Sequence, residues 1–97
     1  MKPEIIAMSR LRGEFSDPRK AVYFDLRIGP ATVQAAWDAH GGWRVEQTFA
    51  PKPMTAADLA RRLGIDEAAA SALLAEAAAL CEREYWRLFP PRLRAVA

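Results

Sequence analysis

The alternation of apolar and polar residues in KAVYFDLRIG, residues 20–29, constrains the fold more than any other feature. Every second residue from Val22 to Ile28 is apolar, and the residues between them are polar or amphipathic. Successive side chains of a β-strand point to opposite faces, so this period of two predicts a strand with one buried face. Such a strand must pair with neighbours and be covered on its apolar side by another layer.

Two turns follow this strand and set the register of a meander. Gly29-Pro30 predicts a two-residue type II′ hairpin, because glycine stands where a positive φ is needed. The facing pairs in that hairpin are apolar: Leu26 with Val33, Phe24 with Ala35 and Val22 with Trp37. For the next turn we predict a three-residue loop, His40-Gly41-Gly42, with one glycine in the left-handed conformation. The pairs that this loop implies are Ala39 with Trp43, Trp37 with Val45, Val33 with Phe49, and Asp38 with Arg44. A two-residue Gly-Gly loop would instead set Trp37 against Glu46.

These strands share one apolar face, and a further strand precedes them. The predicted inward residues are Val22, Phe24, Leu26, Ile28, Val33, Trp37, Trp43, Val45 and Phe49. We expect Trp37 and Trp43 to be core residues with aliphatic neighbours. PEIIAMSRL, near the N-terminus, reads as another strand, and both of its faces are apolar enough that its inward side stays open. GEFSDPR is expected to be a polar loop.

The second half of the chain has helical signals. Thr55 is expected to cap a first helix, with Asp58 three residues later in a variant of the capping box, and Gly64 to end it. Asp66 is expected to cap a long second helix that runs to Pro90-Pro91. The apolar stripe of that helix is Ala70, Leu73, Leu74, Ala77, Leu80, Cys81, Tyr85 and Leu88. We therefore predict an α+β fold in a single domain, 1–97. An antiparallel meander of three or four strands (1–50) is packed on one face by two helices (54–89), and a tail (90–97) follows.

Residues 55–75 carry the spacing of a helix-turn-helix. Leu59, Ala60 and Leu63 supply the inward face of the first helix, Gly64 and Ile65 the turn, and Asp66, Ala70 and Leu73 the start and packing of the second helix. In this the segment resembles the helix-turn-helix family of small DNA-binding regulators, and the resemblance implies DNA binding through the second helix. The residues that would face the groove depart from that role: Asp66, Glu67, Ala68, Ser71, Ala72 and Ala75. None presents the paired hydrogen bonds that base reading uses, and the two acids repel phosphate.

Composition excludes several functional classes. The net charge is +2, and each half of the chain holds seven Lys/Arg and six Asp/Glu, so any attraction to nucleic acid is expected to be weak. The lone Cys81 excludes an internal disulfide and is expected to be a buried apolar residue, and His40 is expected to be a turn residue. No metal-ligand spacing, phosphate loop or catalytic set occurs. We expect no enzyme activity, cofactor or metal, no membrane span and a cytoplasmic location.

These observations favour a non-enzymatic protein-binding module that modulates or inhibits a larger partner, with a nucleic-acid-handling complex as the favoured class. Phage-encoded anti-CRISPR proteins are a class analogy of size only. The partner-binding candidates are Asp66, Glu67, Glu76, Trp86 and Arg87. The other charges of the last helical turns, Glu82, Arg83 and Glu84, are expected to form a solvated face. The outer sheet face (Tyr23, Asp25, Arg27, Arg44 and Glu46) is either a second binding surface or an ordinary solvated face. The alternative is a DNA-binding transcriptional regulator that contacts phosphates through Arg61, Arg62, Arg92 and Arg94. A homodimer through the alanine-rich helix and Trp86 is also predicted.

Overall fold

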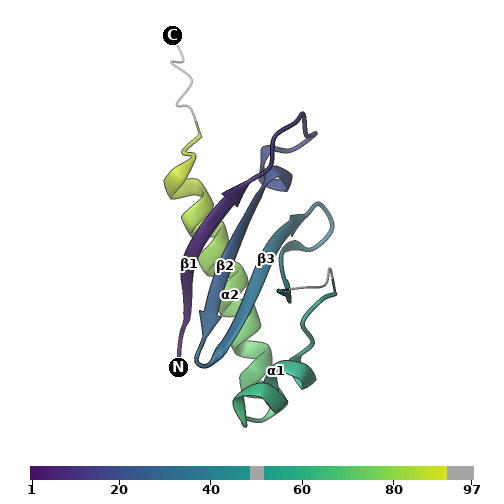
Figure 1. Cartoon of the computed structure of the whole chain (residues 1–97), viewed down its shortest axis with the longest axis vertical. Helices are drawn as coiled ribbons and strands as arrows, with labels where there is room; N and C mark the ends of the chain where they lie inside the picture. The colour runs from purple at the N-terminus through teal and green to yellow at the C-terminus, as the bar shows by residue number, and fades with distance from the viewer. Residues whose placement is uncertain (49–51, 92–97) are drawn as a thin grey trace.

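The computed structural model describes residues 1–48 and 52–91, and these form one antiparallel sheet followed by a helical pair (Figure 1). The described elements, in chain order, are β1 (Pro3–Arg10), the 3-10 helix η1 (Pro18–Ala21), β2 (Val22–Ile28), β3 (Ala31–Asp38), β4 (Gly42–Gln47), α1 (Ala56–Leu63) and α2 (Glu67–Leu88). The sheet order is β1-β2-β3-β4. Helix α2 crosses one face of the sheet diagonally, and α1 packs against α2 at its N-terminal end. The predicted α+β class and the four-stranded version of the meander are confirmed.

The β2–β3 hairpin has the predicted register. Leu26 pairs with Val33 and Phe24 with Ala35, and Gly29 has a φ of 58° at the first turn position. The pairing runs from Tyr23 to Ile28, so the predicted Val22–Trp37 pair lies just beyond it. The alternating side chains of β2 are buried from Val22 to Ile28 as the period of two requires, and Phe24 is fully buried.

The β3–β4 register differs from the prediction by two residues. Trp37 pairs with Trp43, not with Val45, and the turn comprises residues 39–41. The Asp38 carboxylate accepts a hydrogen bond from the His40 N–H at 2.9 Å, which turns the chain one residue early. Gly42 takes the left-handed conformation at a φ of 73°, but it does so as the first residue of β4.

A shift of two residues keeps every side chain on its predicted face. Trp43 and Val45 are therefore buried as expected. Arg44 pairs with Ala36 rather than Asp38, although its Nη1 still lies 3.3 Å from the Asp38 carboxylate. The predicted Val33–Phe49 pair is wrong, since Val33 faces Gln47; Phe49 itself lies outside the described residues.

The structure of β1 shows why its inward face could not be predicted from the sequence. Its register against β2 shifts between Ile5 and Ala7, so a bulge interrupts the alternation. Ile5 and Met8 face Leu26 and Phe24 and so lie on the α2 side, although no single period of two includes both positions. Ile5 is partly buried, whereas Ile6 and Met8 are exposed.

The helix boundaries agree with the capping signals. The Thr55 hydroxyl accepts from the Asp58 N–H at 3.1 Å, and the Asp66 carboxylate accepts from the Ala69 N–H at 2.7 Å. Gly64 ends α1 at a φ of 67°, and α2 ends at Leu88, just before the two prolines. Within the described residues, no helix combines the length and the apolar character that a membrane crossing requires.

The apolar stripe of α2 covers the sheet for most of its length. Ala70, Leu73, Ala77, Cys81 and Tyr85 are buried, and Leu74 and Leu80 are partly buried. Leu88 is the exception, because 37% of it is exposed although it continues the same stripe. Burial raises the pKa of the Cys81 thiol to about 12, so Cys81 is the inert apolar residue that was predicted.

Candidate functional site

The partner-binding candidates fall into two groups at opposite ends of α2. Asp66, Glu67 and Glu76 lie at its cap or in its first half, whereas Trp86 and Arg87 lie in its last turn. Glu67 and Trp86 are nineteen positions apart, which is about 28 Å along a helix. The five residues therefore cannot form one compact site.

The acidic group is exposed, and so are its neighbours toward the predicted groove side. Exposed positions there are Asp66, Glu67, Ala68, Ser71, Ala72, Ala75 and Glu76. The Asp66 carboxylate is committed to capping α2. Of the phosphate-binding candidates, Arg61 forms an ion pair with Asp58 and Arg62 is exposed, while Arg92 and Arg94 lie outside the described residues.

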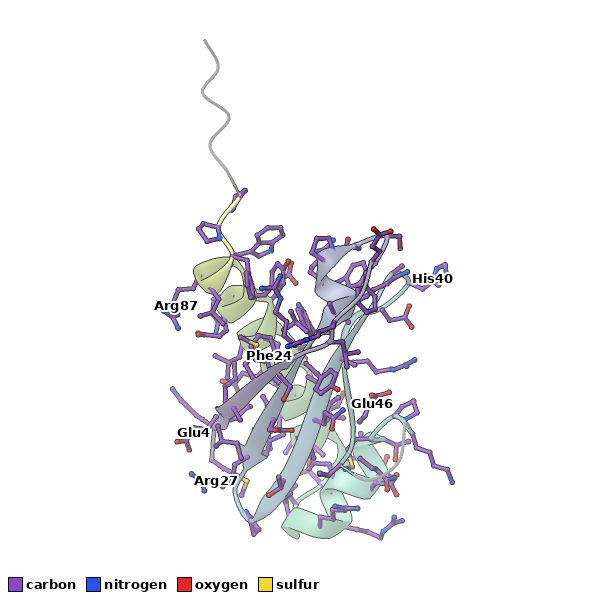
Figure 2. All side chains as sticks on the ribbon, turned by 45° about the horizontal axis from the view of Figure 1, so that its top comes forward. Glu4, Phe24, Arg27, His40, Glu46 and Arg87 are labelled. Carbon is purple, nitrogen blue, oxygen red and sulfur yellow. The ribbon has the colours of Figure 1, made fainter. Side chains whose placement is uncertain are left out.

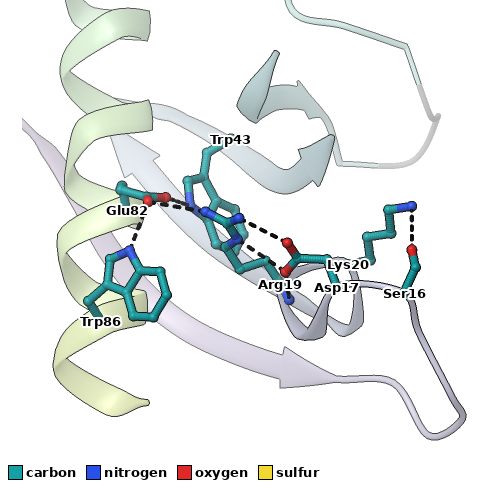
Figure 3. Close-up of polar contacts among 7 residues, drawn as sticks. All are labelled: Ser16, Asp17, Arg19, Lys20, Trp43, Glu82 and Trp86. Carbon is teal, nitrogen blue, oxygen red and sulfur yellow. Dashed lines mark hydrogen bonds and ion pairs between the residues drawn. The ribbon is translucent and has the colours of Figure 1, made fainter. Parts of the chain in front are cut away.

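The group at the other end of α2 is organised around one carboxylate. Glu82 Oε2 accepts a hydrogen bond from the indole N–H of Trp43 at 2.5 Å, and Glu82 Oε1 accepts one from the indole N–H of Trp86 at 2.8 Å (Figure 3). A guanidinium nitrogen of Arg19 lies 3.5 Å from the same Oε1. Glu82 thus links α2 to β4 and to the segment before β2.

Arg19 comes from η1, which fixes it in place. Asp17 caps η1 by accepting the Arg19 N–H at 2.9 Å, and its carboxylate also accepts two bonds from the Arg19 guanidinium, at 3.1 and 2.9 Å. The guanidinium carbon then lies 4.2 Å from the ring centroid of Trp37 and 5.6 Å from that of Trp86. We call Arg19, Trp37, Trp43, Glu82 and Trp86 the indole cluster.

The electrostatics of the indole cluster favour fixed charges. The side-chain hydrogen bonds from Arg19 hold the pKa of the Asp17 carboxyl below its ordinary value, and the same bonds raise the pKa of Arg19. Both groups stay ionised near neutral pH. The cluster therefore offers a rigid arrangement of rings beside the paired charges of Arg19 and Asp17.

Trp86 is the most exposed ring of the indole cluster. Trp86 is 40% exposed, whereas Trp43 is 5% exposed. The Trp86 ring meets Tyr85 edge-on, with centroids 5.1 Å apart and an interplanar angle of 88°. Arg87, the remaining candidate, forms an ion pair with Glu84 and projects from the helix (Figure 2).

One expectation about this region was wrong and one was incomplete. The Glu82 side chain is 41% exposed, as a solvated position would be, but it also accepts hydrogen bonds from two tryptophans. Trp37 is only half-buried, and Arg19 covers it where aliphatic neighbours were expected. The error at Trp37 comes from treating GEFSDPR as a plain loop. Asp17-Pro18, an N-cap residue followed by proline at the first helical position, was the available signal for η1.

The remaining polar residues that the sequence singled out do not form a second candidate site in the part of the chain that the structure describes. His40 lies exposed at the tip of the β3–β4 turn, as predicted (Figure 2). On the outer sheet face Arg44 pairs with Asp38 and Glu46, and Arg27 pairs with Glu4. Glu46 is buried there, contrary to both expectations for that face, because residue 53 bridges to it. Residues 1–48 and 52–91 contain no cluster of His, Cys, Asp and Glu suited to a metal ion.

No protein-family model, curated protein or solved structure matches this chain.

Proposed function

We propose that this chain is a non-enzymatic protein-binding module that modulates or inhibits a larger partner, and that Trp86 is its central contact. The observation that carries the proposal is the fixed, exposed indole of Trp86 at the surface of the indole cluster. Tryptophan and arginine are the residue types that most often supply binding energy at protein interfaces. That the partner belongs to a nucleic-acid-handling complex rests on the helix-turn-helix resemblance alone.

The rigidity of Trp86 is what separates it from other exposed apolar residues. Its N–H donates to Glu82 at 2.8 Å, its ring packs perpendicular to that of Tyr85, and Arg19 lies over it. A side chain held in its bound orientation does not lose rotamer freedom on association, which otherwise costs about 0.5–1.5 kcal/mol. Because the indole N–H is already satisfied, the exposed part of the ring is apolar. It therefore suits an apolar pocket on the partner.

The test is affinity capture with the tagged full chain from a lysate of the organism that encodes it, with and without nuclease. The wild type is expected to retain one stoichiometric protein that survives nuclease. Trp86→Ala is expected to weaken binding of the purified partner by about 30-fold or more, as for an interface residue worth about 2 kcal/mol. Trp86→Phe keeps an aromatic ring but loses the hydrogen bond to Glu82, so its affinity for the partner should lie between those of the wild type and Trp86→Ala.

Leu88→Ala is the matched control, because Leu88 is similarly exposed on the same helical turn but points in another direction. It is expected to retain the partner. The proposal is wrong if Trp86→Ala and Leu88→Ala bind alike, or if the captured material is a nuclease-sensitive mixture. Sub-micromolar binding to mixed duplex DNA at low salt, weakened by the double substitution Arg61→Ala/Arg62→Ala, would support the transcriptional regulator instead.

A further inference from the structure

The two edges of the sheet differ in whether another segment covers them. Along the outer edge of β4, the Met54 N–H donates to Val45 at 2.9 Å and the Gln47 N–H donates to the Lys52 carbonyl at 3.0 Å, so residues 52–54 cover that edge. Strand β1 pairs only with β2 among the described residues, and its residues from Ile6 to Arg10 are exposed. An uncovered edge with apolar side chains is a template for another strand.

Helix α2 extends past this open edge. It crosses behind the sheet so that its C-terminal end emerges beyond β1 (Figure 1). The sheet-facing stripe shows the same thing: Ala77 and Cys81 are fully buried, whereas Leu88, further along that stripe, is 37% exposed. Met8, on the α2 side of β1, is 39% exposed. The helix therefore provides a backing layer for a strand that residues 1–48 and 52–91 do not supply.

An apolar pocket lies at the opposite end of the same edge. Its volume is about 330 Å³, and it is lined by Met1, Ile65, Ala69, Ala72, Leu73 and Glu76. Met1 packs against the turn at Gly29, which places the pocket beside the start of β1 and the first half of α2. At this end α2 lies behind the sheet and does not reach past β1 (Figure 1).

We propose that two copies of this chain pair through antiparallel β1 strands, about a two-fold axis between Ile6 and Ala7. The facing pairs are Ile6 with Ala7, Ile5 with Met8, Glu4 with Ser9 and Pro3 with Arg10. Because of the bulge, these pairs match in face: Ile5 and Met8 both lie on the α2 side, and Glu4 and Ser9 both lie on the outer side. The result is a continuous sheet of two four-stranded halves with both α2 helices on one face.

The shape of the molecule complements its own copy in this arrangement. The Arg10 guanidinium lies 4.9 Å from the Phe89 ring centroid, so the end of α2 is level with the Arg10 end of β1. The two-fold axis sets Arg10 against Pro3 of the other copy, next to that copy's Met1. Leu88 is thereby brought to the apolar pocket. Arg87 beside Leu88 and Glu76 at the pocket carry opposite charges.

A disulfide test reads the register directly. Facing residues in an antiparallel pair have Cα atoms about 4.5–5.5 Å apart, within the range of a disulfide. In the double variant Glu4→Cys/Ser9→Cys the two cysteines of one chain are about 16 Å apart along the strand and cannot join each other. Mild oxidation is expected to give a covalent dimer. Glu4→Cys/Ala7→Cys, whose cysteines have no facing cysteine in this register, is the control and should stay monomeric.

Sedimentation velocity across a concentration series gives the second test. We expect a monomer–dimer equilibrium whose dissociation constant rises at least about tenfold with Met8→Lys or Leu88→Glu, because each places a charge in the apolar contact. Both positions are exposed in the monomer, so its thermal midpoint should change little. Trp86→Ala is expected to leave the equilibrium unchanged. A monomer at every concentration, or a dimer lost only with Trp86→Ala, overturns the proposal. Equal oxidation of the control pair does the same. This inference does not depend on the proposed function.

Discussion

Replacing Glu82 with alanine tests the indole cluster as a structural unit. The Glu82 carboxylate accepts from two indole N–H groups, one buried in Trp43 and one exposed in Trp86. Removing it leaves the Trp43 N–H without an acceptor in a residue that is only 5% exposed. The Trp86 N–H regains a water molecule, so its loss costs little. The two donors therefore respond unequally, and the buried one determines the result.

The magnitude follows from these two environments. A buried donor left unsatisfied costs about 1–3 kcal/mol, and the partly exposed contact between Arg19 and Glu82 adds at most about 1 kcal/mol. We expect the free energy of unfolding to fall by about 2 kcal/mol. For a domain of this size that lowers the thermal midpoint by about 8–16 °C. Glu82→Gln keeps one carbonyl oxygen and should lose about half as much.

Thermal unfolding followed by far-UV circular dichroism measures the effect. The control is Glu84→Ala on the same helix, since Glu84 pairs only with Arg87 at the surface and its removal should cost about 0.5 kcal/mol or less. If Glu82→Ala lowers the midpoint by no more than Glu84→Ala does, then the indole cluster does not stabilise the fold. The claim that it fixes Trp86 would fail with it.

Two further substitutions test other parts of the fold. The pKa of Asp17 is lowered in the folded state, so its contribution is present above the ordinary aspartate pKa of about 3.9 and lost as the pH falls below it. The stability difference between wild type and Asp17→Asn should therefore shrink in chemical denaturation below about pH 4; a constant difference would contradict it. Gly64→Ala should lower the unfolding free energy by about 1 kcal/mol, because Gly64 has a φ of 67° and only the backbone is strained. Gly41→Ala, at an open position without a positive φ, should change it by less than about 0.5 kcal/mol, and equal losses at both sites would refute the reasoning.

The sheet could be predicted from the sequence where a single local pattern decided the face or the register of a strand. The period of two assigned the buried face of β2 without error, and Gly29-Pro30 set the register of the first hairpin. The predicted register of the second hairpin was wrong by two residues, because the Asp38 side chain as well as the glycines determines where the chain turns. The alternation of apolar and polar residues cannot detect a register error of two residues, since such an error leaves each side chain on the same face of the sheet.

The candidate site was predictable only in part, for a different reason. Trp86 lies off the apolar stripe of α2, so periodicity alone marks it as exposed. Glu82 and Arg19 are polar residues whose importance depends on the rings that they contact. Trp43 is 39 positions from Glu82, and Trp37 is 18 positions from Arg19. Helix periodicity says nothing about such a contact. The Asp17-Pro18 cap was readable, but its consequence for Trp37 depended on the tertiary fold.

The two surfaces at the end of α2 can act at the same time. Trp86 and Leu88 are two positions apart, and at 3.6 residues per turn their side chains point in directions about 160° apart. Leu88 follows the stripe toward the β1 edge, whereas Trp86 faces Arg19 and solvent. A dimer through β1 therefore leaves both Trp86 rings free. A partner complex with two equivalent sites would then be bound bivalently, with a gain in avidity that Met8→Lys removes because it breaks the dimer, whereas Trp86→Ala weakens each single contact and leaves the dimer intact.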